Sequence, residues 1–418
     1  MEPSLFLSRS QVQAIQREFG TPVYVYDEAT LERQARQALG FPCPFGLTAR
    51  FAMKALPNVA ILRLLHDLGL HIDASSGYEA ERAQRAGIPP EHIELTAQEL
   101  PHNLARLVEA GVQFNACSLA QLAAFGERFP GASLGVRVNP GLGSGHNNRT
   151  NVGGPSSSFG IWHEYIPRVL ETARALNIHI TRVHTHIGSG GDPEVWTTCA
   201  KLSLDAAARF PEVATLNLGG GFKVARMPGE KAANLQEIGE AVSKILRQHA
   251  EAHGRQLKLE IEPGTFIVAN AGALIATVMD VVDTGSGGYR FIKADAGMTD
   301  VLRPAIYKAQ HPITLVPAST GARPAADYLI AGHCCESGDV LTPEPGNPEG
   351  LLPRSLPEAH IGDALVIGGA GAYCSAMCCK NYNSFPEAAE VLLRKNGELR
   401  LIRKRQTLDQ MLANEMLL

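Results

Sequence analysis

Three side chains of different chemistry follow apolar segments of the chain, each near the end of its segment. They are Lys54 after Arg50–Met53, His186 at the end of Arg182–Ile187, and Glu262 after Lys258–Ile261. An amine shielded from water can form a Schiff base with an aldehyde, a flat imidazole can stack on an aromatic ring, and a carboxylate can keep a ring nitrogen protonated. The ordinary alternatives are a surface lysine, a structural histidine and an exposed helix cap.

Glycine-rich turns follow the same segments. Gly188, Ser189 and Gly190 come directly after Ile187, and Gly219, Gly220 and Gly221 follow Thr215–Leu218. Such turns expose backbone N–H groups that no Cβ obstructs, as a phosphate site requires, although a single triplet is more often only a tight turn. Two of them on neighbouring strands favour a phosphate site, to which Ser189 would add a hydroxyl. The remaining candidates near strand ends are Asp73, Gly264 and Thr265.

A further group of polar residues lies in the last third of the chain. Arg303 and Tyr307 are four residues apart, so a guanidinium and a phenol are close enough to hold a carboxylate. Glu336 follows Cys335 and could hold an ammonium group, and Tyr373 ends the sequence Gly-Ala-Tyr. A buried cysteine, a surface ion pair and a core tyrosine are the plain explanations for the same residues.

These side chains require a scaffold that brings strand ends together. Eight short β-rich runs alternate with helical stretches between residues 50 and 265: Arg50–Met53, His71–Ala74, His92–Leu95, Val112–Ala116, Leu134–Val138, Arg182–Ile187, Thr215–Leu218 and Lys258–Ile261. Alternation of this kind predicts parallel βαβ units, and eight of them favour a (β/α)8 barrel over an open doubly wound sheet. In a barrel, the residues that follow the strands share one mouth.

The pattern changes after about residue 270. Ile267–Val282, Tyr289–Ala294, Pro312–Val316, Tyr328–Ala331 and Ala364–Ile367 are β-like, and Asn396-Gly397 predicts a hairpin. We therefore expect an α/β protein with a barrel over residues 28–270 and a mostly antiparallel β domain over residues 1–27 and 271–418. Thr21–Asp27 would supply a strand to the β domain, and Gln406–Leu418 would form a short C-terminal helix.

Composition narrows the classes of protein. The 418 residues carry a net charge of −4, which gives no reason to expect a nucleic-acid partner. We find no apolar run long enough for a membrane span and no signal peptide. The eight cysteines suit reduced thiols in the cytoplasm, and their spacing predicts no metal site.

The ordered set of motifs resembles the pyridoxal-phosphate (PLP) dependent decarboxylases of the alanine-racemase-like fold (fold type III), and within them most closely the diaminopimelate decarboxylase family. The resemblance runs nearly end to end, through Val23–Asp27, Phe51–Lys54, His184–Gly190, Asn217–Phe222, Glu260–Gly264, Arg303–Tyr307, Cys335–Asp339, Gly371–Tyr373 and Tyr382–Ser384. It implies decarboxylation of meso-2,6-diaminopimelate to L-lysine and CO2, the last step of lysine biosynthesis.

The resemblance also implies roles for single residues. Lys54 would be the PLP lysine, His186 would stack on the ring, and Glu262 would face the ring nitrogen. The phosphate would be held by Ser189, Gly219, Gly220, Gly221, Gly264 and Tyr373. Cys335 and Tyr373 would come from the second subunit of a homodimer, with Cys335 as the proton donor. Asp73 would belong to the cofactor site, and Arg303, Tyr307, Glu336, Tyr373 and Thr265 to the substrate site.

Two departures from the family pattern stand out. The family usually has arginine after Glu-Pro-Gly, where this chain has Thr265, and that arginine helps to hold the distal carboxylate of diaminopimelate. The segment Cys374–Lys380 is slightly longer than usual, so Lys380 is a candidate for the missing positive charge.

Thr265 leaves alternatives open: a related decarboxylase for D-lysine, D-ornithine or a carrier-bound amino acid. D-lysine and D-ornithine have no distal carboxylate, so Arg303 and Tyr307 would have nothing to hold. This argues against the two diamino acids as substrates. A racemase on the same barrel and a PLP-free binding homologue are further alternatives. Retention of Lys54, His186, Glu262 and Cys335 together argues against the last of these.

Overall fold

The computed structural model describes residues 6–142, 153–186, 190–347 and 349–418. Contacts divide the chain into two compact units. Unit 1 comprises residues 1–31, 225–230 and 268–418, and unit 2 comprises residues 32–224 and 231–267. The short segment 225–230 thus joins unit 1, although it lies between strands of unit 2 in the sequence.

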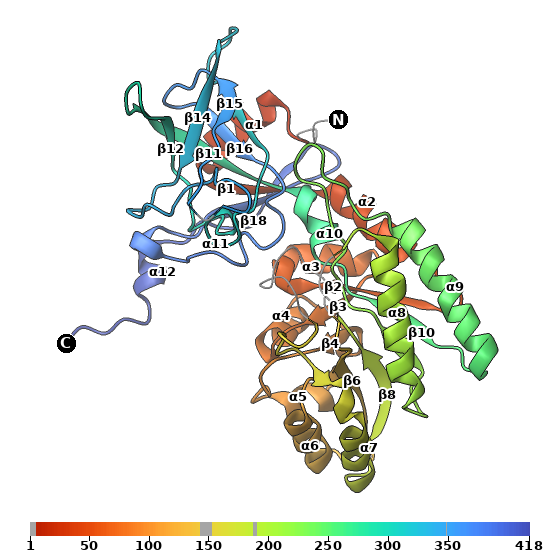
Figure 1. Cartoon of the computed structure of the whole chain (residues 1–418). Helices are drawn as coiled ribbons and strands as arrows, with labels where there is room; N and C mark the ends of the chain where they lie inside the picture. Colours follow the sequence, from red (N-terminus) through yellow and green to blue (C-terminus); the bar gives the residue numbers. More distant parts are fainter. Residues whose placement is uncertain (1–5, 143–152, 187–189, 348) are drawn as a thin grey trace. The chain divides into compact units, whose positions relative to one another are not determined.

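Unit 2 is a closed barrel of parallel strands (Figure 1). The described strands are β2 (Leu47–Ala52), β3 (His71–Ala74), β4 (Ile93–Leu95), β5 (Gln113–Ala116), β6 (Ser133–Asn139), β8 (His179–His184), β9 (Thr215–Asn217) and β10 (Lys258–Ile261). They pair in this order, and β10 pairs in turn with β2, which closes the ring. A short strand β7 (Ile161–Trp162) adds to β6. The predicted (β/α)8 barrel is confirmed, and each of the eight β-rich runs contributes one of its strands.

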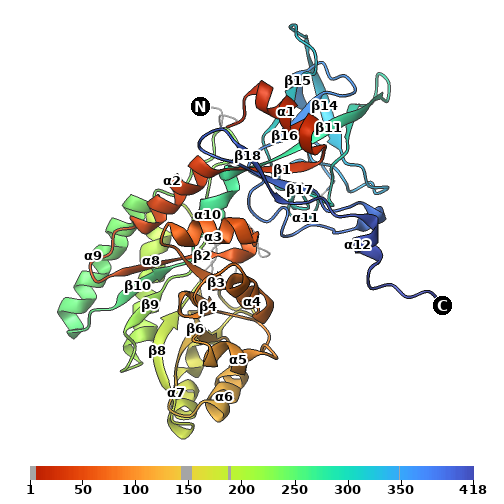
Figure 2. The same cartoon turned by 180° about the vertical axis from the view of Figure 1, so that it is seen from behind.

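Helices precede, connect and follow the strands of the barrel (Figure 2). They are α2 (Glu28–Leu39), α3 (Val59–Asp67), α4 (Gly77–Arg85), α5 (Leu104–Glu109), α6 (Leu119–Arg128), α7 (Ile166–Ala175), α8 (Pro193–Ala208), α9 (Leu235–His253) and α10 (Thr265–Val268), with single 3-10 turns η1 (Met53–Ala55), η2 (Pro90–His92) and η3 (His163–Tyr165). Local signals set their starts: the Ser76 and Ser118 side chains accept hydrogen bonds from the amides of Glu79 and Gln121 and cap α4 and α6. Leu122 and Phe125, three residues apart, form the buried face of α6.

Unit 1 is built on a mixed sheet. Its elements are α1 (Arg9–Phe19), β1 (Val23–Asp27), η4 (Ala269–Ala271), β11 (Gly272–Asp283), β12 (Arg290–Ala294), α11 (Arg303–Tyr307), β13 (Ile313–Val316), β14 (Ala325–Ala331), β15 (Arg354–Pro357), β16 (Ala364–Ile367), η5 (Tyr382–Ser384), β17 (Ala389–Leu393), β18 (Leu399–Arg403) and α12 (Leu408–Leu412). Two pairings, β1–β17 and β12–β14, are parallel and the other described pairings are antiparallel. Alternate residues such as Val23 and Val25 of β1 pack on α1, because side chains of a strand alternate between its two faces.

One predicted strand begins later than expected. The run from Ile267 was expected to be β-like, but Thr265–Val268 is a helical turn and Ala269–Ala271 a 3-10 turn, so that β11 starts at Gly272. The residues Ile267, Val268 and Ala269 are all buried, and a short run that is buried on every side has no period from which helix and strand can be distinguished.

Candidate active site

Lys54 and Asp73 lie side by side at the carboxyl ends of neighbouring barrel strands. Lys54 follows β2 in η1, and its Nζ is 4.0 Å from Asp73 Oδ2. The Lys54 side chain is 44% exposed, whereas that of Asp73 is 2% exposed. Burial and the nearby charge of Glu262 raise the pKa of Asp73 to about 7, while Lys54 opposes the rise. The carboxylates of Asp73 and Glu262 and the amine of Lys54 therefore act on one another at one end of the barrel.

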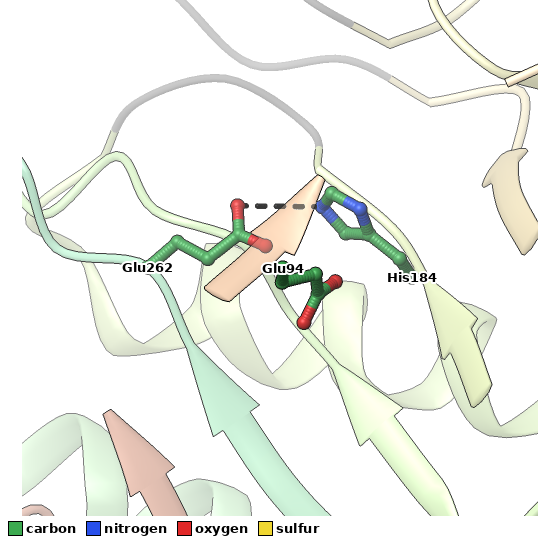
Figure 3. A group of neighbouring side chains, drawn as sticks. All are labelled: Glu94, His184 and Glu262. Carbon is green, nitrogen blue, oxygen red and sulfur yellow. Dashed lines mark ion pairs between the residues drawn. The ribbon is translucent and has the colours of Figure 1, made fainter. Parts of the chain in front are cut away.

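Glu262 follows β10 and is held by its neighbours. Its Oε1 accepts a hydrogen bond of 2.7 Å from Asn217 Nδ2, and its Oε2 lies 3.5 Å from His184 Nε2 (Figure 3). Burial raises the pKa of Glu262, while Lys54 and the Asn217 hydrogen bond lower it. A cationic group at this carboxylate would relieve the cost of its burial.

Two histidines near this carboxylate are neutral. Burial, with the nearby positive charges of Arg137 and Lys54, holds the pKa of both His184 and His186 well below the usual range. Both ring nitrogens of His184 and the Nδ1 atom of His186 are buried and have no hydrogen-bond partner among the described residues. A neutral imidazole next to an aromatic ring can pack against its face without repelling a positive charge on that ring.

The turn after β9 is closely fitted to its surroundings. Gly219 has φ +69°, and a Cβ there would lie 2.7 Å from His186 Nδ1. A Cβ on Gly220 would lie 2.2 Å from the backbone oxygen of Glu262. The amide of Gly219 donates to Asn217 Oδ1 at 2.8 Å, whereas the amides of Gly220 and Gly221 make no hydrogen bond to other described residues. The turn therefore offers free N–H groups at a place that only glycine fits.

The neighbouring glycine turns meet this one. Gly190 donates to the carbonyl of Gly221 at 2.9 Å, which places the turns after β8 and β9 side by side. A Cβ on Gly264 would lie 3.2 Å from Ala52 Cβ. Ser189 lies outside the described residues.

A buried network of charges fills the barrel beneath these residues, and the sequence analysis missed it. Arg50 Nε is 2.8 Å from Glu94 Oε2, and Arg50 Nη2 is 2.8 Å from Glu260 Oε1. Arg182 Nε adds a contact of 2.8 Å to Glu260 Oε2. The two guanidiniums lower the pKa of Glu260 to about 2, while burial and Glu260 raise the pKa of Glu94 to about 8. The signal in the sequence was a charged residue inside each of four apolar strands.

Glu94, His184 and Glu262 bring possible metal ligands within 4.8 Å of one another (Figure 3). Arg50 already sets a positive charge against Glu94, and Asn217 donates to Glu262. Because Arg50 already sets a positive charge against Glu94, only Glu262 and the neutral His184 remain as ligands, and we assign no metal to the cluster.

The remaining candidates belong to unit 1 and are described within it. Arg303 and Tyr307 lie on α11, and both are partly buried. Cys335 and Glu336 are exposed; the Cys335 amide donates to Asn383 Oδ1 at 2.9 Å. Tyr373 is partly buried at φ +54°.

Lys380, considered above as a substitute for the missing arginine, is already paired. Its Nζ lies 2.8 Å from Glu387 Oε2 within unit 1. A role for Lys380 in place of the missing arginine stays a prediction.

Comparison with known proteins decides the family. Residues 29–269 match the family described as "Pyridoxal-dependent decarboxylase, pyridoxal binding domain". The chain belongs to the pyridoxal-dependent decarboxylase family. It is 38% identical to a diaminopimelate decarboxylase of Escherichia coli strain K12 over the whole length of both chains.

Solved structures of the family agree with this. A crystal structure of diaminopimelate decarboxylase superposes with a TM-score of 0.92 at 36% identity, covering 100% of this chain and 99% of the other. The Helicobacter pylori diaminopimelate decarboxylase complexed with L-lysine gives a TM-score of 0.85 at 26% identity, with 96% and 98% covered.

The cofactor of the family is pyridoxal phosphate, and the residues present fit it. The site has an amine on Lys54 and a turn with free amides at Gly220 and Gly221. It also has a buried carboxylate on Glu262, which a positively charged group would stabilise. Bound there, the cofactor supplies an electrophilic aldehyde and a ring that stores an electron pair.

Proposed function

We propose that this protein decarboxylates meso-2,6-diaminopimelate to L-lysine and CO2, the closing reaction of lysine biosynthesis. The observation that carries the proposal is the meeting of Lys54, Asp73 and Glu262 at the carboxyl end of a closed barrel, in a chain similar over its full length to diaminopimelate decarboxylases. Residues 28–270 would carry the cofactor.

In this proposal the residues of the barrel hold the cofactor and control its protonation. Lys54 would provide the amine that holds the cofactor, and Glu262 would keep a proton on the ring nitrogen, which would strengthen the ring as an electron sink. His186, which burial keeps neutral, would lie against the ring. The phosphate is bound by the amides of the glycine turn, together with Ser189, Gly264 and Tyr373.

The residues of unit 1 would act on the substrate. Arg303 and Tyr307 hold the distal carboxylate, Glu336 holds the distal ammonium, and Cys335 delivers the proton to the carbon that loses CO2. Cys335 and Tyr373 come from the second subunit of a homodimer. The exposure of Cys335 in a single chain supports such a shared site.

The cytoplasm is the compartment we propose. All eight cysteines are free, as expected of thiols in a reducing environment. Among the described residues, no helix combines the length and apolar character needed to span a bilayer.

A substrate panel tests the function. CO2 release by the PLP-loaded protein is measured from meso-diaminopimelate beside D-lysine, D-ornithine, L-lysine and L-ornithine. The proposal expects diaminopimelate to give the highest kcat/KM, with L-lysine as the product. A higher value for a substrate without a distal carboxylate would favour the second candidate, a decarboxylase of changed distal specificity, to which Thr265 points.

A further inference from the structure

Arg226 lies in the segment 225–230, which follows barrel strand β9 in the sequence but belongs to unit 1. No role has been assigned to it so far. Its Nε donates to the carbonyl of Gly369 at 3.1 Å. Gly369 has φ +62°, and a Cβ at this position would lie only 3.0 Å from Arg226 Cδ. Because glycine has no Cβ, the Arg226 side chain can pack against the backbone at Gly369. Glu230 Oε2 closes the segment by accepting hydrogen bonds from the amides of Arg226 and Met227, at 2.7 and 3.1 Å. These hydrogen bonds and the close packing on Gly369 thus fix the position of Arg226.

Arg226 shares its surroundings with Arg303. Burial lowers the pKa of Arg226 to about 9, and the charge of Arg303 is the next largest cause. The pKa of His311 is lowered to about 3 by burial and then by both arginines. Burial raises the pKa of the Cys374 thiol to about 11, and the charges of Arg303 and Arg226 both act to lower it. The charges of both guanidiniums therefore reach the same two groups, His311 and Cys374.

The hydrogen-bonding capacity of this cluster is not satisfied within the described residues. Arg226 Nη2 and Arg303 Nε are excluded from solvent and have no hydrogen-bond partner there. His311 Nδ1 lies 2.9 Å from the Gly368 carbonyl, which only accepts, so Nδ1 carries the proton of the neutral ring and Nε2 is an acceptor. This Nε2 is also buried, and it makes no hydrogen bond to either arginine among the described residues. Two neighbouring guanidiniums with buried, unpaired N–H groups are costly unless an anion joins them. A carboxylate or phosphate matches their planar donors.

We propose that Arg226 and Arg303 together bind the distal carboxylate of the substrate, and that Arg226 supplies the positive charge which the chain lacks at Thr265. The inference rests on the proposed function for the identity of the substrate, but not for the existence of the anion site. Arg226, which lies outside the motifs of the family, would then determine the specificity for a substrate with a second carboxylate. Lys380 is not needed for this charge, since Glu387 pairs with it.

The test uses a probe that cannot react. Pimelate has the carbon chain and both carboxylates of diaminopimelate but no amino group, and its binding to the PLP-loaded protein is measured by titration calorimetry. The proposal expects Arg226→Met to weaken pimelate by about 30-fold or more, as for removal of one partner of a buried charge pair. Arg247→Met, at an exposed arginine of α9, is the control and should bind as the wild type does.

Additional variants separate the possible outcomes. Arg226→Lys keeps the charge but loses the planar fork, so an intermediate affinity is expected even if Arg226→Met folds poorly. Arg226→Met with Thr265→Arg should recover part of the lost affinity. Equal pimelate affinity in the wild type, Arg226→Met and Arg226→Lys would overturn the proposal.

The phosphate of the cofactor is the other source of an oxyanion. If Arg226→Met and Arg226→Lys weaken PLP binding and leave pimelate binding unchanged, the cluster serves the phosphate and the proposal is wrong. If pimelate binding depends on Arg226 but the wild type does not decarboxylate diaminopimelate, the proposed function fails while the dicarboxylate site stands.

Discussion

Asn217 donates a hydrogen bond of 2.7 Å to the carboxylate of Glu262, and the other end of the same amide accepts the N–H of Gly219 at 2.8 Å. One buried side chain therefore fixes both the carboxylate assigned to the ring nitrogen and the start of the turn assigned to the phosphate. The two ends of a bound cofactor would depend on it.

Replacing Asn217 by alanine should weaken PLP binding about tenfold, because a buried acceptor on Glu262 loses its donor. The dissociation constant, measured from the quenching of protein fluorescence on PLP addition, checks this. Asn414→Ala, at an exposed position near the C-terminus, should leave it unchanged. An unchanged constant in Asn217→Ala would show that neither contact matters for the cofactor.

Gly220→Ala should abolish tight PLP binding. Its Cβ would lie 2.2 Å from the backbone oxygen of Glu262, so either the turn or the end of β10 must shift. Gly287→Ala is a matched control, since no atom lies within 4 Å of a Cβ there and φ is not in the left-handed region. Wild-type affinity in Gly220→Ala would mean that the turn does not touch the cofactor.

The sequence predicts the barrel well because its strands are short, apolar and separated by helices. β3 and β10 begin and end at the predicted residues, and Lys54 and Glu262 follow their strands as expected. The hairpin at Asn396-Gly397 also forms, between β17 and β18. In these cases the local pattern and the fold agree.

The sequence does not reveal contacts that only barrel closure creates. Arg50 and Glu260 are 210 positions apart and meet because β10 pairs with β2. Arg226 is likewise absent from the predicted site, since nothing in its local pattern indicates that its segment belongs to unit 1.

The contribution of Asp73 to the stability of the cofactor-free protein should fall as the pH rises from about 4 to about 7. The folded state holds a proton on Asp73 up to about pH 7, whereas the ordinary pKa is 3.8, so the stabilisation is complete below pH 4 and is lost above 7. Asp73 alone accounts for roughly 4 kcal/mol of that loss. Urea unfolding at pH 5 and pH 8 should capture roughly 3 kcal/mol of this loss, because about two of the three pKa units lie between those pH values.

The side-chain amide of Asp73→Asn does not titrate. Between pH 5 and pH 8, this variant should therefore lose less free energy of unfolding than the wild type. Asp205→Asn, at an exposed position on α8, serves as the control and should match the wild type. The same loss in all three proteins would contradict the assignment of a neutral Asp73.

Mixing two inactive variants tests the shared site. Lys54→Ala and Cys335→Ala should each have little activity, but a mixture allowed to exchange subunits should recover up to about a quarter of wild-type activity, because a mixed dimer of a symmetric pair keeps one intact site. Sedimentation velocity confirms the dimer. Absence of recovery in exchanged dimers would place Lys54 and Cys335 of one site on the same chain.

Lys54, as the residue that carries the cofactor, is the central feature of the proposed site. Borohydride reduction of the PLP-loaded protein, followed by proteolysis and mass spectrometry, locates the attachment. We predict the pyridoxyl group on the peptide that contains Lys54, and no labelled peptide after Lys54→Ala. A label on another lysine of the wild type, or none, would contradict the site described here.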